Sequence, residues 1–317
     1  MTSLKNRILG LIPLILIITF LSFSLMKLAP GDPTTMMMDP KATAADALRI
    51  RHNLGLDKPL LVQYGLWLNQ VVHGNLGYSL VTGKPVLGSI TERLPATLLL
   101  SVTSLVIIVG LSLPLGLLSG AYKNSAFDHV LTIMVFIGFS IPTFWLGMML
   151  ILFFCVTLNL FPTSGFIDPG VTGLVPTLLS VLSHLFLPLL TIVIGGFAGL
   201  TRFQRFSVIT ILHQDYIKAA RARGLSETRI LFRHAFKNAA LPLVTLLGLE
   251  LPGLLGGAFV IEYIFAWPGM GQLGVAAVFS RDYPILMGTL LIGACLIILG
   301  NLLSDLTYRL IDPRIRT

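Results

Sequence analysis

Hydrophobic residues occur in long, nearly unbroken segments, and polar stretches separate these segments along the whole chain. A helix rises about 1.5 Å per residue and the hydrocarbon core of a bilayer is about 30 Å thick, so about 20 apolar residues form a span. Six segments meet this requirement: Ile8–Leu28, Thr97–Ala121, Val130–Leu158, Leu182–Leu200, Ala240–Phe265 and Ile285–Tyr308. The pattern predicts an all-α integral membrane protein with six transmembrane helices.

The composition supports this fold class. Of the 317 residues, 55% are hydrophobic and only 11% are charged, whereas ordinary globular domains are about 25% charged. The net charge of +8 is not accompanied by basic patches interleaved with aromatic residues, so no nucleic-acid partner is expected and the lipid bilayer is the predicted surroundings. Cys155 and Cys295 both lie inside apolar runs, which predicts neither a disulfide framework nor a metal site.

The orientation follows from the positive charges in the short loops. Lys5 and Arg7 precede the first span and place the N-terminus in the cytoplasm. No small-residue cleavage site closes that span, so it is predicted to be retained as a helix and not removed as a signal peptide. Six crossings return the C-terminus, with Arg309, Arg314 and Arg316, to the cytoplasmic side. The basic segment between the fourth and fifth spans then faces the cytoplasm as well.

That segment between the fourth and fifth spans reads DYIKAARARGLSETRILFRHAFKN from Asp215 to Asn238. Its first part, as far as Arg223, is rich in Ala and Arg and contains no helix breaker, which predicts a short helix. Gly224 suits the left-handed residue that closes such a helix. Ser226 can then cap a second helix, with Leu225 and Ile230 placed for a hydrophobic staple.

The second helix is predicted to be amphipathic and to lead into the fifth span. One face carries apolar residues at helical spacing, namely Phe232, Ala235, Phe236 and Ala239, and another carries Arg229, Arg233 and Lys237. Two interpretations fit this pattern. The basic stripe can meet anionic lipid headgroups, or the whole loop can dock a cytoplasmic partner. Small residues at 219, 220 and 224 favour docking, because they let another surface approach the backbone closely.

The run from Lys218 to Gly224 resembles the EAA loop of ABC-importer permeases, which reads Glu-Ala-Ala, three residues, Gly. Lys218 stands in place of the Glu, and Leu241-Pro242 comes later than in the sugar-importer version; both departures resemble the peptide and nickel branch of the family. Further motifs resemble that branch in order along the chain: APGDP (29–33), LGLDKPLLVQY (54–64), GNLGYS (74–79), RLPATLLL (93–100), IPTFWLG (141–147), GGAFVIEYIFAWPGMG (256–271), RDYP (281–284) and DPRIR (312–316).

The resemblance implies a type I ABC importer permease fold with both termini cytoplasmic, in the cytoplasmic membrane of a bacterium or archaeon. It divides the chain into three parts: 1–94, a first transmembrane helix plus an extracytoplasmic segment; 95–308, the core of five helices with a coupling loop at about 204–239; and 309–317, a cytoplasmic tail. In this family the permease pairs with a second, non-identical permease subunit, two ATPase subunits and an extracytoplasmic substrate-binding protein. The implied substrates are peptides.

The resemblance also assigns candidate residues. The loop that couples to the ATPase subunits would comprise Asp215, Lys218, Ala219, Ala220, Arg221, Gly224 and Ser226. No cofactor is expected on this chain, which is not expected to be an enzyme: it has no GxxxxGK[ST] phosphate-binding loop, so ATP and Mg would sit on the partner subunits.

Within and beside the fifth span, acidic and small residues are candidates for the translocation path. A carboxylate inside a membrane faces a partner or a watery cavity because its burial is costly. Glu250 is therefore predicted to line the path, or else to hydrogen-bond across a helix contact. Gly253, Gly256 and Gly257 mark a bend or a close packing seam that could belong to the same path. Glu262 is predicted to act at an outer gate or to have a structural role.

Other functions remain as alternatives. Within the importer class, the solute could be nickel, a metal chelate or glutathione. A membrane-embedded hydrolase would need a nucleophile beside a base, and Ser180, Ser183 and His184 form the single cluster of that kind in the sequence. A secondary transporter would show inverted repeats and broken helices, and no repeat is visible.

Overall fold

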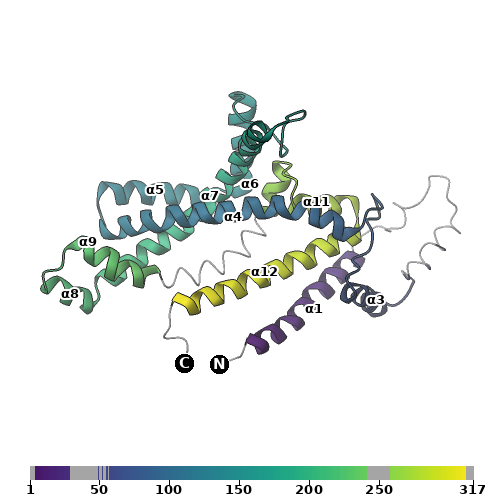
Figure 1. The fold of residues 1–317 in the computed structure, drawn as a ribbon, viewed down its shortest axis with the longest axis horizontal. Helices are drawn as coiled ribbons and strands as arrows, with labels where there is room; N and C mark the ends of the chain where they lie inside the picture. The colour runs from purple at the N-terminus through teal and green to yellow at the C-terminus, as the bar shows by residue number, and fades with distance from the viewer. Residues whose placement is uncertain are drawn as a thin grey trace. The chain divides into compact units, whose positions relative to one another are not determined.

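A computed structural model describes residues 4–28, 57–240 and 258–311, together with positions 49, 52 and 55. Its helices, drawn in Figure 1, are α1 (Leu4–Leu28), α3 (Leu60–Val72), α4 (Val86–Ala121), α5 (Ala126–Ser140), α6 (Thr143–Leu150), η2 (Ile151–Thr157), α7 (Leu174–Leu212), α8 (Asp215–Ala222), α9 (Glu227–Arg229), η3 (Ile230–Ala235), α11 (Met270–Ser280) and α12 (Tyr283–Ile311). The chain forms two compact units. The first comprises Met1–Ala96 and Pro268–Ile298, and the second comprises Thr97–Trp267 and Leu299–Thr317.

Three of the described helices are long and apolar enough to cross a membrane: α4, α7 and the 283–302 part of α12. They extend the second, fourth and sixth predicted spans at one or both ends. The first predicted span lies wholly within α1, which includes the apolar stretch Ile12–Leu28. The fifth predicted span, Ala240–Phe265, lies mostly outside the described residues.

The third predicted span, Val130–Leu158, is not one helix. Helix α5 ends at Ser140, and the helical pair formed by α6 and η2 continues at an angle of 97° to it. The cause is the Ile141-Pro142 dipeptide. A residue before proline avoids the helical region, and Ile141 is extended, with φ −89° and ψ 123°. The third predicted span is therefore two helical pieces that meet at this proline.

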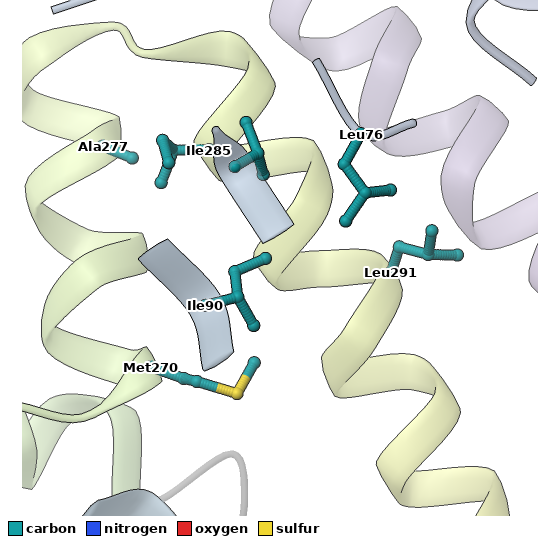
Figure 2. Packing of buried hydrophobic residues seen from close by; sticks show 7 residues of the cluster. Leu76, Ile90, Met270, Ala277, Ile285 and Leu291 are labelled. Atoms are coloured by element: carbon teal, nitrogen blue, oxygen red, sulfur yellow. The ribbon is translucent and has the colours of Figure 1, made fainter. Parts of the chain in front are cut away.

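The first unit is held together by a core of apolar side chains from α4, α11, α12 and the segment that precedes α4. Figure 2 shows how Ile90, Met270 and Ile285 point toward one another, beside Leu76 and Leu291. The packing is close: a Cβ on Gly288 would lie 2.5 Å from Cγ1 of Val86. Glycine is required there because a side chain would collide with this neighbour.

A second cluster in the same unit joins α1, α3 and α12. Phe23 and Met26 of α1 pack with Met287 of α12 and with Tyr64 and Trp67 of α3. The Thr19 hydroxyl also lies 2.9 Å from the Tyr64 hydroxyl. These contacts show what the apolar side of α3 covers.

In the second unit, α7 packs closely against both α4 and α5. On α4, Gly116 and Gly120 lie one turn apart, and a Cβ on either would fall 2.7 Å from the Cβ of Gln204 or Val208 of α7, respectively. Small residues at this spacing let two helix backbones approach closely. Helix α5 adds Leu131 and Val135, which pack with Ala198 of α7.

Candidate functional site

The polar loop after α7 is built around the short helix α8, which follows α7 after only His213 and Gln214 (Figure 1). One side of α8 faces inward: Ile217 and Ala220 are buried together with Ile230. Leu225 packs against the same cluster, so it lies with Ile230 as the predicted staple requires. Three apolar contacts thus anchor a helix that is otherwise exposed and charged.

Gly224 closes α8 in a left-handed conformation, with φ +80°, as the sequence predicts. Its N–H donates to the carbonyl of Arg221 at 2.9 Å, and the N–H of Leu225 donates to the carbonyl of Ala220 at 3.3 Å. This pair of bonds is a Schellman motif, in which the residue after the glycine also makes an apolar contact back to the helix. Arg223 donates from Nε to the carbonyl of Ala219 at 3.3 Å. The turn is therefore fully bonded and fixed in direction.

Ala219 and Ala220 differ in their surroundings. Ala219 is exposed, whereas Ala220 is 2% exposed and packs inside the loop. The methyl group of Ala220 faces the chain's own core, and its part in a docking surface stays a prediction. A surface that approaches α8 from outside meets Ala219 and the open side of Gly224, where a Cβ would have nothing within 4 Å.

Two ion pairs lie on the exposed side of the loop. Lys218 donates to Asp215 at 2.9 Å within α8. Arg221 reaches across the glycine turn and donates from Nε and Nη2 to the two carboxylate oxygens of Glu227, at 2.7 and 3.1 Å. The hydrogen bonds from this guanidinium hold the pKa of the Glu227 carboxyl below its usual range. The second pair ties the end of α8 to the start of α9.

The second helix of the loop begins at Ser226 but deviates from the prediction in two ways. Ser226 occupies the capping position, yet its side chain makes no capping hydrogen bond. The helix then widens into the π-helical turn η3 at Ile230–Ala235 and returns to α-helix over 236–240. The π-helical turn changes which residues of the helix face the interior. Ile230, Leu231, Ala235 and Ala239 are buried, whereas Phe232, which the sequence placed on the apolar face, is 56% exposed.

The basic stripe is where the sequence placed it, since Arg229, Arg233 and Lys237 are all exposed. A hollow of about 290 Å³ also lies beside α8 and is lined in part by Lys123, Lys218 and Arg221. Positive charge therefore surrounds α8 on more than one side. Such a field favours a partner surface that carries acidic groups.

A second polar cluster lies where α4, α5 and α7 meet, and none of the predicted site residues belongs to it. The Asp128 carboxylate of α5 accepts from Nε and Nη2 of Arg205 on α7 at 2.6 and 2.8 Å. It also accepts from the Ser119 hydroxyl of α4 at 2.5 Å and from the Asn124 N–H at 2.9 Å. One carboxylate thus joins three helices and a turn. We call Ser119, Asp128 and Arg205 the junction.

A local signal for this cluster exists in the sequence. Ser125-x-x-Asp128 before an apolar run matches the capping-box pattern, and the Ser125 hydroxyl accepts from the Asp128 N–H at 3.2 Å. The acid of such a box bonds back to the capping residue. Here the Asp128 side chain turns to Arg205 instead, and sequence spacing carries no sign of that partner 77 residues away.

The residues proposed for the translocation path are placed as follows. Glu250, Gly253, Gly256 and Gly257 lie outside the described residues. Glu262 is fully buried, and its carbonyl accepts from the N–H of Trp267 at 2.8 Å. Its role at an outer gate stays a prediction.

In this structure neither Ser180 nor Ser183 donates its hydroxyl to His184, as the hydrolase alternative would require. Ser180 donates its hydroxyl to Asp168 at 2.8 Å, and the imidazole of His184 lies 2.8 Å from the Ser180 carbonyl oxygen through Nδ1. A serine nucleophile needs its hydroxyl on the base, but this hydroxyl bonds to a carboxylate. Asp168 lies 3.8 Å from the other nitrogen of His184. The three groups fasten the segment before α7 to that helix.

Within the described residues, no group of three or more His, Cys, Asp or Glu side chains could hold a metal ion.

Comparison with known proteins supplies the family. Residues 112–317 match the family described as "Binding-protein-dependent transport system inner membrane component", and residues 1–101 match its N-terminal counterpart. The chain is 44% identical over 311 residues to "Oligopeptide transport system permease protein AppB" of Bacillus subtilis, with 98% of each chain covered. It is 37% identical to "Dipeptide transport system permease protein DppB" of Escherichia coli, covering 98% of this chain and 97% of that one.

The fold is also found among solved structures. A chain described as "Inward facing conformations of the MetNI methionine ABC transporter" superposes with a TM-score of 0.58 at 18% identity, covering 71% of this chain and 97% of that chain. At this identity the match concerns the fold alone. The two family matches together extend over nearly the whole sequence. The chain therefore belongs to the family of inner membrane components of binding-protein-dependent transport systems.

Proposed function

We propose that the chain is a permease subunit of an ATP-driven importer that carries di- or oligopeptides across the cytoplasmic membrane. The observation that carries this proposal is the end-to-end similarity to relatives named as oligopeptide and dipeptide permeases, at 44% and 37% identity over 98% of this chain. Similarity over the full length extends to the outer segment and to every described helix. A shared docking loop alone would not specify the solute.

The ATP chemistry belongs to partner subunits in this proposal, with no cofactor on this chain. The part that would meet those subunits is the exposed side of α8, formed by Asp215, Lys218, Ala219 and Arg221 together with Gly224. Support comes from its anchoring: Ile217 and Ala220 fix α8 to the chain, and the bonded turn fixes its direction. A rigid, charged helix that ends in an open glycine can fit a cleft and transmit a displacement to α7.

We further propose six spans with both termini in the cytoplasm, which places α8 on the same side as the ATPases. The basic residues of the loop support this orientation. Single cysteines introduced into a chain that lacks Cys155 and Cys295 test it. Arg229→Cys should react with an impermeant maleimide only after the cytoplasmic side is opened, and reaction from the outside alone would exclude the orientation.

The importer would also need a second, non-identical permease subunit and an extracytoplasmic binding protein. One coupling loop per permease serves one cleft, so a pair of ATPase subunits requires two permeases. A purified complex that contains this chain as its single permease and transports at the full rate would contradict the heterodimer.

Within the same complex, Glu250, Gly253, Gly256 and Gly257 are proposed to line the path and Glu262 to support its outer end. Complexes with Glu250→Gln and Glu262→Gln test these two roles. A path residue should change uptake without loss of assembly, whereas a structural residue should lower the amount of assembled complex.

Uptake by proteoliposomes that contain the purified complex tests the function as a whole. Peptide loaded on the partner binding protein should enter only when ATP is supplied on the side of the membrane that carries the ATPase subunits. A non-hydrolysable ATP analogue should not support entry. Uptake that persists without ATP would indicate a secondary transporter. Uptake of nickel, a metal chelate or glutathione in place of peptides would replace the proposed solute and leave the ATP-driven mechanism intact.

A further inference from the structure

We propose that Arg205 and Asp128 are positioning residues that lock α4, α5 and α7 into a single body, so that a displacement of α8 moves all three helices together. This inference rests on the proposed function, because it concerns how ATP-driven motion reaches the membrane part of the chain. It assigns a role to two residues that lie outside the loop itself. Four observations carry it.

The first observation is the bonding at the junction. Both carboxylate oxygens of Asp128 are used: Oδ1 accepts from Ser119 and from Nε of Arg205, and Oδ2 accepts from Asn124 and from Nη2 of Arg205. A bidentate Arg–carboxylate pair fixes orientation as well as distance. The Asp128 side chain is 3% exposed and that of Arg205 is 28% exposed, so water competes less for these bonds than it does at a surface pair. The junction therefore resists both sliding and rotation of α5 on α7.

The second observation is that the helices touch closely at the same level. A Cβ on Gly120 of α4 would lie 2.9 Å from the carbonyl oxygen of Arg205, and a Cβ on Gly116 would lie 2.9 Å from the carbonyl oxygen of Thr201. Backbones this close cannot slide past one another without a collision. Packed interiors of this kind change only between discrete arrangements. The ion pair and the glycine seam thus brace the same turn of α7 from two sides.

The third observation is the direct route from the junction to α8. Val208, which is one turn beyond Arg205 and fully buried, packs with Leu117 of α4 and with Leu231, Ala235 and Ala239 of the loop. Helix α7 itself reaches α8 after two residues. Both halves of the loop are therefore attached to the braced end of α7.

The fourth observation is the length of α7. Its 39 residues span roughly 58 Å at about 1.5 Å per residue, nearly twice the hydrocarbon thickness. A displacement of α8 acts on the end of this long helix. It moves the neighbouring helices as well only if α7 is attached to them near that end. The junction holds it there, 10 residues before α8 begins at Asp215. Without this brace, α7 could tilt or bend alone while α4 and α5 stayed in place.

The alternative is that the junction serves stability only. The two roles separate in one ratio, the number of solute molecules taken up per ATP hydrolysed by the assembled complex. Loss of stability lowers the amount of complex and reduces uptake and hydrolysis in proportion, so the ratio is constant. If the junction is lost, the ATPase subunits still hydrolyse ATP and displace α8, but α4 and α5 no longer move with α7. Uptake per ATP hydrolysed therefore falls.

The test uses the complete complex in proteoliposomes. The double variant Asp128→Asn with Arg205→Gln removes both charges, so neither is left buried without its partner, and it is expected to assemble. Its uptake per ATP should fall about tenfold, within the range usual for coupling between sites. The matched control is Arg202→Gln on the same helix: Arg202 lies over the Phe139 ring and is not part of the junction. Its ratio should equal that of the wild type.

A double variant that retains the wild-type ratio would overturn the proposal, as would an equal fall in the Arg202→Gln control. If the double variant does not assemble, Arg205→Lys decides, because it keeps the charge and loses the bidentate geometry. Its ratio should fall about threefold, and an unchanged ratio would again overturn the proposal. A wild-type complex without ATP-driven uptake would instead refute the proposed function, so the two failures are distinct.

Discussion

Two arginine–carboxylate pairs in the second unit have almost the same geometry and opposite surroundings. Arg205 and Asp128 form a two-pronged contact at 2.6 and 2.8 Å, and Arg221 and Glu227 form one at 2.7 and 3.1 Å. The Asp128 side chain is 3% exposed, whereas that of Glu227 is 69% exposed. Water screens the second pair and reaches the first only at Arg205, whose side chain is 28% exposed. Geometry alone therefore does not rank ion pairs; burial decides which one is structural and which one is free to exchange partners.

The largest expected effect is at the buried pair. Asp128→Ala leaves the Arg205 guanidinium partly buried without its carboxylate, and breaking a pair of this kind costs about 3–5 kcal/mol. The thermal midpoint of the purified permease should fall sharply, and membrane levels should fall with it. The matched control is Asp215→Ala, which removes an exposed carboxylate paired with Lys218 and should leave the midpoint unchanged. Equal effects of the two variants would show that burial does not separate the pairs.

The next effect is expected at the glycine seam beside the buried pair. Gly120→Val adds a Cβ that would lie 2.7 Å from the Cβ of Val208. Overpacking of this kind costs about 1–3 kcal/mol and should separate α4 from α7. The loss should be visible as a lower thermal midpoint. Gly110→Val on the same helix is the control, because a Cβ at Gly110 has nothing within 4 Å, and it should change the midpoint little.

A smaller stability effect with a large functional effect is expected at the turn of the exposed loop. Gly224→Val forces a β-branched residue into a left-handed conformation, which costs about 1–2 kcal/mol or more. It also places a side chain on the open surface beside Ala219. The permease should insert normally, while binding of the ATPase subunits and uptake should both fall. Pull-down with the ATPases and an uptake assay measure this.

Gly224→Asn is the matched control for that change, because Asn adopts left-handed conformations more readily than Val. It should retain most of the binding if backbone strain is the cause and lose it if added volume is the cause. If Gly224→Val binds the ATPases and transports normally, the exposed side of α8 is not the docking surface, and contact with lipid headgroups remains as its role.

The smallest effect is expected at the exposed pair. Because the folded pKa of Glu227 lies below its unfolded value, the contribution of the pair is present above pH about 4.3 and is lost as the pH falls through the folded pKa. For a pair this exposed the contribution is below about 1 kcal/mol. The protection factors of the amides from Gly224 to Arg229, which correct for the intrinsic pH dependence of exchange, should fall slightly on acidification, and Glu227→Gln should remove that fall. A large change in these protection factors would show that the exposed pair contributes to stability as the buried pair does.

The sequence predicted the parts of the molecule that depend on local chemistry. Gly224 was predicted to be left-handed because a short Ala- and Arg-rich helix ends there, and its φ of +80° confirms it. The exposed basic stripe of Arg229, Arg233 and Lys237 was predicted for a similar local reason. The long apolar helices α4, α7 and α12 follow from hydrophobicity over about 20 residues, and only their ends were misplaced.

The parts that depend on distant partners could not be predicted. Asp128 was not among the predicted site residues, because nothing near it in sequence shows that Arg205 lies against it. The count of apolar residues does not register the break at Ile141-Pro142, because one proline changes little in a segment of that length. Phe232 was assigned to the wrong face because the helical period of 3.6 residues fails inside a π-helical turn.

That wide turn has a consequence for how the loop can change in length. In η3, each N–H bonds one residue farther back than in an α-helix, so the turn holds one residue more than the regular helix on either side of it. Deleting one exposed residue there, Arg233 for instance, would convert the turn to ordinary α-helix. Ala239 would keep its place against Val208. Ile230–Ala235 is therefore the place in the loop where a single-residue deletion is absorbed, whereas the same deletion within α8 would rotate its buried face out of the core.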